Sequence, residues 1–163
     1  MLNIQQLFNK FANTDKTDKT DKHGIINVMC VSICLRNFSV ISSEVSLIKL
    51  ANLMQHFYST IAEVTLKNHG DIDRFCGDSV MIFFRQDVRL SEDAALEFGK
   101  GVIDKLYKYG DLMLDIGVGI SGGEIIYGEF GSDSRATVTG FGHPINCAIQ
   151  LARNNSGVSK EMR

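Results

Sequence analysis

Residues 73–84 read DRFCGDSVMIFF and hold the strongest fold signal in the chain. The run from residue 71 to residue 84 indicates two short strands that meet at Cys76-Gly77-Asp78, a tight turn in which Gly77 can take a positive φ. The second strand is almost entirely apolar, as is typical of a strand that is buried on both faces. These residues therefore predict a β-hairpin in the interior of a sheet.

The segment before the hairpin predicts one strand and one long helix. Residues 25–35 are rich in β-branched and apolar residues and predict a strand, on which Cys30, Ser32 and Cys34 share a face. Residues 43–67 carry apolar residues at spacings of three and four, which predicts an amphipathic helix that starts after Ser42 or Ser43.

The segment after the hairpin predicts a helix, a second hairpin and a last helix. A helix is expected from Ser91 to about residue 109, with a core stripe of Ala95, Phe98, Val102 and Leu106. Residues 112–120 alternate between apolar and polar or glycine residues, so we expect a strand packed on one face. The remaining expectations are a turn at 122–123, a partner strand at 124–127, a polar loop at 131–136 and a helix from Pro144 to about Arg153.

Composition sets the broad class of the protein. The 163 residues are 44% hydrophobic and 22% charged, which is ordinary for one soluble globular domain. A net charge of -2 gives no electrostatic reason to expect nucleic acid or an anionic membrane as a partner. No apolar run approaches the roughly 20 residues of a membrane span. The four cysteines form no Cys-x-x-Cys pair, and we expect reduced thiols in a cytoplasmic protein.

The first 24 residues are expected to lie outside the domain. Residues 1–11 could form a short amphipathic helix, and residues 14–22 repeat the tripeptide Thr-Asp-Lys, which has no apolar side chain to bury. We therefore assign residues 1–24 to an N-terminal segment and linker, and residues 25–163 to the folded domain.

Two stretches together resemble the class III nucleotidyl cyclases. Residues 73–84 resemble the central hairpin of that family, and residues 139–150, TGFGHPINCAIQ, align without a gap with its nucleotide-binding segment. The resemblance spans residues 27–157. It implies an α+β fold with a ferredoxin-like antiparallel sheet and helices on one face, which agrees with the element order expected above. Family members usually add strands after the last helix, so the sheet of a chain of this length could lack them.

The resemblance assigns two positions to metal ions. In the family, two carboxylates hold two Mg²⁺ or Mn²⁺ ions that neutralise charge as the triphosphate cyclises. Asp78 matches the second carboxylate, and Cys34 stands at the position of the first. A thiol is a soft ligand and a poor substitute for a bridging carboxylate. We therefore expect weak Mg²⁺ or Mn²⁺ binding.

Four further positions follow from the same resemblance. Arg74 and His143 match the Lys and Asp that recognise the base in adenylyl cyclases, so adenine selectivity is not expected. Asn146 matches the Asn that orients the ribose. Gln150 replaces the Arg that stabilises charge in the transition state.

Each of these side chains also has a purely structural interpretation. Asp78 follows a glycine in a turn, which is common turn chemistry, and Asn146 in the first turns of a helix could bond to the backbone. His143 before Pro144 could be a surface residue at the helix start. A thiol metal site of Cys34, Cys76 and His143 lacks the spacing of zinc ligands.

The sequence therefore predicts a degenerate cyclase homology domain that dimerises and acts as a regulatory or nucleotide-binding module. The alternative is a divergent active cyclase that converts a nucleoside triphosphate to a 3′,5′-cyclic monophosphate and pyrophosphate. Either form would act as a homodimer or as a heterodimer with another cyclase domain, and the sequence leaves open whether the protein is an enzyme.

Overall fold

The computed structural model describes residues 23–85 and 92–162. The expected helix and linker of residues 1–22, and Ser91 as a helix start, lie outside these ranges. The helices are α2 (Phe38–Glu44), α3 (Leu47–Lys67), α4 (Glu92–Leu106) and α5 (His143–Asn154). The strands are β1 (His23–Leu35), β2 (Asp71–Cys76), β3 (Ser79–Arg85), β4 (Lys108–Tyr109), β5 (Leu112–Met113), β6 (Ile116–Ser132), β7 (Arg135–Phe141) and β8 (Gly157–Met162).

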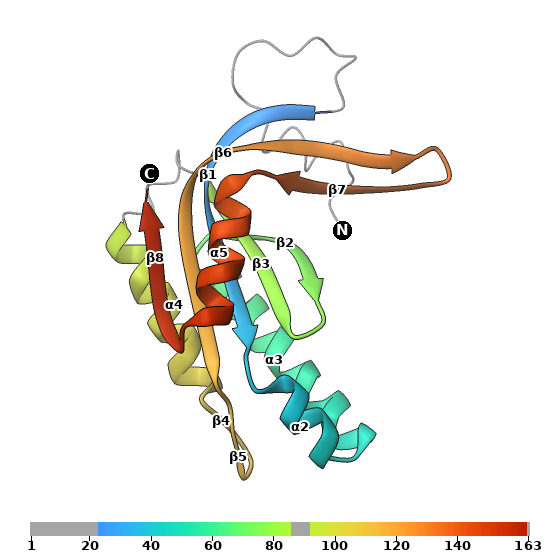
Figure 1. The fold of residues 1–163 in the computed structure, drawn as a ribbon, viewed down its shortest axis with the longest axis vertical. Helices are drawn as coiled ribbons and strands as arrows, with labels where there is room; N and C mark the ends of the chain where they lie inside the picture. The colour runs from blue at the N-terminus through green and yellow to red at the C-terminus, as the bar shows by residue number, and fades with distance from the viewer. Residues whose placement is uncertain (1–22, 86–91, 163) are drawn as a thin grey trace.

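The main sheet has the order β2-β3-β1-β6-β7, and all of these neighbours are antiparallel (Figure 1). The expected hairpin is confirmed, because β2 and β3 flank a turn in which Gly77 has φ +62°. β1 lies at the centre between β3 and β6, so its residues are buried from Val28 to Leu35. The α+β class and the antiparallel sheet agree with the sequence prediction.

Helices cover both faces of this sheet. Alternate β1 side chains, including Val31 and Ile33, pack with α3 and α4, which lie behind the sheet in Figure 1. The intervening side chains Val28 and Cys30 pack on the other side with Ile145 and Ala148 of α5. The sequence predicted helices on one face of the sheet. This holds for α3 and α4, whereas α5 lies across the opposite face.

The predicted helix over residues 43–67 is wrong at its start. Residues 38–44 form the separate helix α2, and α3 begins at Leu47 after Ser46, whose side chain accepts a hydrogen bond from the Lys49 backbone N–H. The break falls at Val45 and Ser46, which are both extended. Ser46 is a better N-cap than Ser42 or Ser43 because its own backbone leaves the helical region.

The predicted second hairpin is wrong in its turn. Instead of turning at residues 122–123, β6 runs unbroken from Ile116 to Ser132, and its pairing with β1 continues through both glycines. The chain reverses ten residues later, and most of the expected polar loop belongs to the hairpin of β6 and β7. Strand β7 was not predicted.

The start of β6 is buried on both faces, contrary to the predicted packing on one face. A Cβ added at Gly117 would lie 1.9 Å from the Ala152 carbonyl oxygen, and one at Gly119 would lie 2.0 Å from the Ala148 carbonyl oxygen. The two glycines therefore let α5 lie directly on the strand. The same segment of β6 also pairs in parallel with β8.

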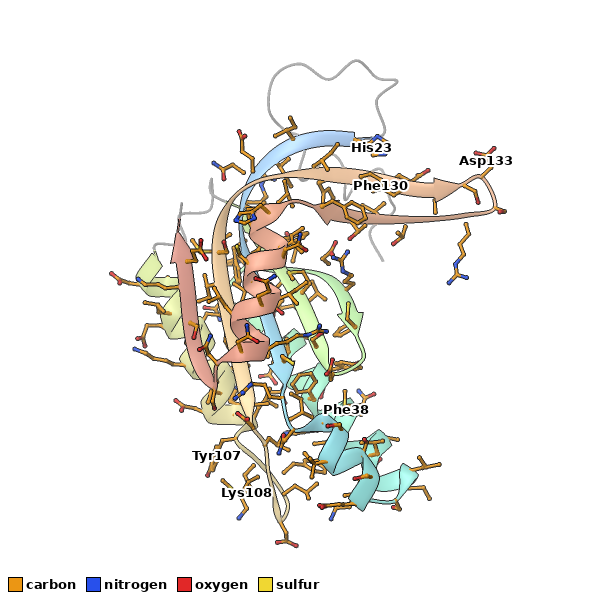
Figure 2. The ribbon with its side chains drawn as sticks, in the orientation of Figure 1. His23, Phe38, Tyr107, Lys108, Phe130 and Asp133 are labelled. Carbon is orange, nitrogen blue, oxygen red and sulfur yellow. The ribbon has the colours of Figure 1, made fainter. Side chains whose placement is uncertain are left out.

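The hairpin of β6 and β7 projects well beyond the rest of the sheet, and Asp133 lies near its tip (Figure 2). Phe130 stacks on His23 at a ring-centroid distance of 4.4 Å, which ties this arm to the start of β1. Within residues 23–85 and 92–162, no helix combines the length and hydropathy that crossing a membrane requires.

Candidate functional site

Cys34 and Asp78, which are 44 positions apart in the sequence, lie together at one end of the sheet. Cys34 pairs with Ser79 across β1 and β3, and the Leu35 backbone N–H donates to the Asp78 carbonyl at 2.8 Å. The turn itself is held by the Tyr58 hydroxyl, which donates to the Gly77 carbonyl at 2.5 Å. The structure thus brings together the two positions that the resemblance assigns to metals.

These two residues line a pocket of about 280 Å³ together with three charged residues, Arg36, Asp115 and Arg153. Arg36 Nη1 donates to both carboxylate oxygens of Asp115, at 2.9 and 3.2 Å, and Arg36 Nε donates to the Arg153 carbonyl at 3.0 Å. Ser156 Oγ donates to Asp115 Oδ1 at 2.7 Å. The Asp115 carboxylate is therefore already engaged by two donors.

Cys34 is a neutral thiol in this pocket. Its side chain is 3% exposed, and burial, followed by the nearby Asp78 carboxylate, raises its pKa above the ordinary thiol value. The cations of Arg153 and Arg36 and a hydrogen bond from the Arg153 side chain act in the opposite direction, but the net shift of the pKa is upward. The protonated thiol is the dominant form at neutral pH.

The residues present do not fit a pair of hard divalent cations. A protonated thiol supplies no anionic oxygen, and Asp115 is ion-paired with Arg36. Two arginines and two aspartates line the pocket, so their charges cancel. Mg²⁺ and Mn²⁺ prefer several oxygen ligands and net negative charge. Among the described residues that line the pocket, Asp78 has the one carboxylate that forms no ion pair with a lining arginine.

Arg74 belongs to a second group of side chains, on β2 and β7. Its guanidinium lies 3.1 Å from Asp73 Oδ2 and donates to the Thr139 hydroxyl, which in turn donates to Asp73 Oδ2 at 2.9 Å. Burial raises the pKa of Asp73 to about 6, against the lowering effects of Arg74 and Thr139. Arg74 is thus fixed by contacts within its own chain.

The other three positions lie on α5. His143 is its first residue, and Asn146 and Gln150 are exposed one turn apart on the same side of the helix. His143 Nε2 lies 3.2 Å from Cys147 Sγ. None of these three lines the pocket of Cys34 and Asp78. Within one chain Cys34 and Asp78 therefore lie together, Arg74 contacts Asp73 and Thr139 instead, and the three α5 positions lie outside the pocket.

Sequence reasoning missed the charged residues around the first group. Arg36 and Asp115 meet because Leu35 pairs with Ile116, which places the residues just beyond this pair side by side. That register was not predictable without the long β6. Arg153 did carry a signal, because it lies three residues after Gln150 on a predicted helix.

No protein-family model matches the chain. An uncharacterized protein of Mycobacterium bovis is 30% identical over 106 residues, which are 63% of this chain and 19% of that protein. An uncharacterized protein of Mycobacterium tuberculosis matches to the same extent. The chain thus spans about a fifth of the length of these relatives.

The fold is similar to that of solved adenylyl and guanylyl cyclases. The guanylyl cyclase Cya2 has a TM-score of 0.73 at 21% identity, and the match covers 86% of this chain and 77% of that one. The adenylyl cyclase CyaB from Pseudomonas aeruginosa has a TM-score of 0.72 at 23% identity, with 86% and 79% covered. A class III adenylyl cyclase-like ATP-binding protein from the same organism has a TM-score of 0.70 at 14% identity, with 86% and 33% covered. These similarities establish a cyclase-like fold.

Proposed function

We propose that this chain is a degenerate cyclase homology domain that self-associates and acts as a regulatory or nucleotide-binding module. The observation that carries this proposal is the chemistry of the pocket at Asp78. A neutral, buried Cys34 stands beside the Arg153 guanidinium where the resemblance places a metal-bridging carboxylate. Removing one preorganised charge stabiliser typically lowers the rate by a factor of 10² to 10³. Besides the carboxylate at Cys34, the charged side chain expected at the position of Gln150 is also missing.

Self-association is supported by an exposed apolar row that crosses three strands. Ile25 on β1 pairs with Ile126 on β6, and Ile126 pairs with Phe141 on β7, so the three side chains lie on one face. They are 68%, 42% and 51% exposed, respectively. Contiguous exposed apolar surface of this kind is typical of protein interfaces. A second copy of the chain would cover this apolar row.

Sedimentation of the purified chain at micromolar concentration tests this interface. We expect self-association of the unmodified protein and a shift toward monomer in Ile126→Lys. Leu47→Lys is the matched control, because Leu47 is 81% exposed but lies at the start of α3, away from the row. A monomeric unmodified chain, or equal loss of association in both variants, would contradict the proposed interface.

Nucleotide binding is supported by the retained Asn146, by Arg74, and by the similar fold of the ATP-binding protein described above. The pocket's cancelling charges lead us to expect that Mn²⁺ adds little to binding. Calorimetry with a non-hydrolysable triphosphate, with and without Mn²⁺, measures this directly. Tight binding of two Mn²⁺ ions per chain would be inconsistent with the proposal.

The second candidate is a divergent active cyclase, which the retained Asp78 and Asn146 favour. The deciding assay incubates the purified chain with each of the four nucleoside triphosphates and Mn²⁺ and detects cyclic product by mass spectrometry. Under the first proposal, product stays at the level of an Asp78→Asn control. Substantial turnover that Asp78→Asn abolishes would establish the enzyme instead.

A further inference from the structure

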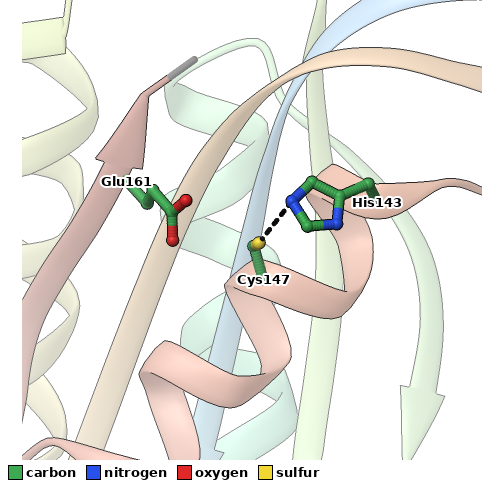
Figure 3. A group of neighbouring side chains, drawn as sticks. All are labelled: His143, Cys147 and Glu161. Atoms are coloured by element: carbon green, nitrogen blue, oxygen red, sulfur yellow. Dashed lines mark hydrogen bonds between the residues drawn. The ribbon is translucent and has the colours of Figure 1, made fainter.

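His143, Cys147 and Glu161 converge at one corner of the domain, outside the pocket of Cys34 and Asp78 (Figure 3). One ligand atom from each residue can be chosen so that all three atoms lie within 4.8 Å of one another. His143 Nε2 lies 3.2 Å from Cys147 Sγ. The three side chains thus present an imidazole nitrogen, a thiol sulfur and a carboxylate to one point.

The local topology explains why these residues meet. His143 and Cys147 are four positions apart at the start of α5, so they lie on one face of the helix. Only two residues join the end of α5 to β8, so the strand returns along the helix. Measured from this connection, Glu161 lies about 13 Å along β8. Cys147 lies about 10 Å and His143 about 16 Å along α5. The lengths match, so Glu161 reaches the start of the helix.

We propose that His143 Nε2, Cys147 Sγ and a Glu161 carboxylate oxygen form a binding site for a divalent transition metal, with Zn²⁺ as its occupant. Zinc bond lengths of 2.0–2.3 Å place tetrahedral ligand atoms about 3.3 to 3.6 Å apart. The contact of 3.2 Å is close to these values, whereas the 4.8 Å limit exceeds them, so a side-chain rotation has to bring the most distant ligand atom nearer.

The donor set selects the class of metal. Nitrogen, sulfur and oxygen donors together suit Zn²⁺ and its neighbours, whereas Mg²⁺ and Mn²⁺ prefer oxygen alone. A thiolate and a carboxylate balance the charge of a divalent ion, and the thiol proton is released on binding. His143 is exposed, which gives the metal a path from solvent, while Cys147 is 8% exposed and fixed in the core.

Three protein ligands leave one tetrahedral position for water or an exogenous ligand. The metal would also join α5 to β8 and so hold the C-terminal strand against the helix. The inference does not rest on the proposed function, since it uses no nucleotide and no second chain, although His143 is also a position that the resemblance assigns to the base.

The test uses the full chain, purified with a reductant and a chelator and then freed of the chelator. Zn²⁺ is titrated in competition with a chromophoric chelator, and Co²⁺ is added to a second sample. We expect one Zn²⁺ per chain, a thermal midpoint that rises with added Zn²⁺, and a thiolate-to-cobalt charge-transfer band in the near ultraviolet.

The variants His143→Ala, Cys147→Ser and Glu161→Gln should each weaken Zn²⁺ binding at least about tenfold. Cys147→Ser should also abolish the cobalt charge-transfer band. Cys76→Ser is the matched control, because Cys76 is the exposed cysteine and lies on β2. Circular dichroism without metal checks that each variant is folded. Unchanged affinity in folded Cys147→Ser, or equal losses in Cys76→Ser, would overturn the proposal.

Discussion

Replacing Asp73 by Asn should change how the stability of the fold depends on pH. The Asp73 side chain has no exposed surface, and its Oδ1 atom has no hydrogen-bond partner within the part of the chain that the structure describes. Its Oδ2 atom accepts from Thr139 and lies 3.1 Å from the Arg74 guanidinium. Asn keeps the size of the side chain but cannot ionise.

The magnitude follows from the shift in pKa. Burial raises the pKa of Asp73 from 3.8 to about 6, so the folded chain holds this proton more tightly than the unfolded chain. Asp73 therefore stabilises the fold below pH 4, and this contribution is lost as the pH rises through 6. A shift of about two units corresponds to about 3 kcal/mol. The ionised carboxylate costs the native state that amount at pH 7 and above.

Urea denaturation at intervals from pH 4 to pH 8 measures the free energy of unfolding of both proteins. The value for Asp73→Asn minus that for the unmodified chain should rise by about 2 kcal/mol between pH 4 and pH 7, because part of the full effect of about 3 kcal/mol is already lost at pH 4. Asp104→Asn on α4 is the control, because Asp104 is exposed and its loss removes one charge without a buried site. A difference that stays flat with pH, or one that falls, would refute this account of Asp73.

Three further predictions concern the packing of α5, the pocket at Asp78 and the cysteines. Gly119→Ala should lower the free energy of unfolding by about 3 kcal/mol in urea denaturation, because its Cβ would lie 2.0 Å from the Ala148 carbonyl oxygen. Gly101→Ala on α4, where an added Cβ meets no atom within 4 Å, should raise that free energy by up to about 1 kcal/mol. Cys34→Asp alone should gain little Mn²⁺ affinity by calorimetry, because the new carboxylate pairs with Arg153, and adding Arg153→Ala should raise the affinity at least about tenfold. Equal affinity in both variants would show that Arg153 is not the obstacle. Cys76 should react first with iodoacetamide under native conditions, as mass spectrometry of digested protein would show, because the other three cysteines are buried and burial raises the pKa of Cys30 to about 12.

The fold could be predicted where a segment's pattern has one physical cause. β3 is apolar because both of its faces are covered, and the stripe from Ala95 to Leu106 is the side of α4 that faces the core of the domain. The prediction failed in β6, where glycines that usually mark a turn instead admit α5 and the bend of a long strand. A single sequence does not distinguish these two uses of glycine.

The site could be predicted only as positions along the chain. Cys34 and Asp78 meet because of the long-range β1–β3 register, which pairs Cys34 with Ser79. Arg36 directly follows β1, whereas its neighbours Asp115 and Arg153 come from two other segments, and the contacts among the three depend on tertiary packing. The charge of the pocket, which decides its chemistry, was therefore not accessible from the motifs alone.

On α5, the position of Gln150 lacks a cation while Arg153 supplies one next to the pocket. In the family that the sequence resembles, the Arg at the position of Gln150 stabilises transition-state charge. Here Gln150 supplies no charge, and Arg153, nearly one turn later, lines the pocket beside Cys34 of the same chain. Because Gly117 and Gly119 seat α5 directly on β6, this arginine stays close to the pocket. A cation that would aid catalysis is thus absent, and one that opposes metal binding is present. Under the proposed function we expect cyclase activity only when Cys34→Asp, Arg153→Ala and Gln150→Arg are combined, since a site that works as a unit gains little from any one of them. Cyclic product in the triple variant but in none of the single variants would support the proposed function. Product in the unmodified chain would refute it.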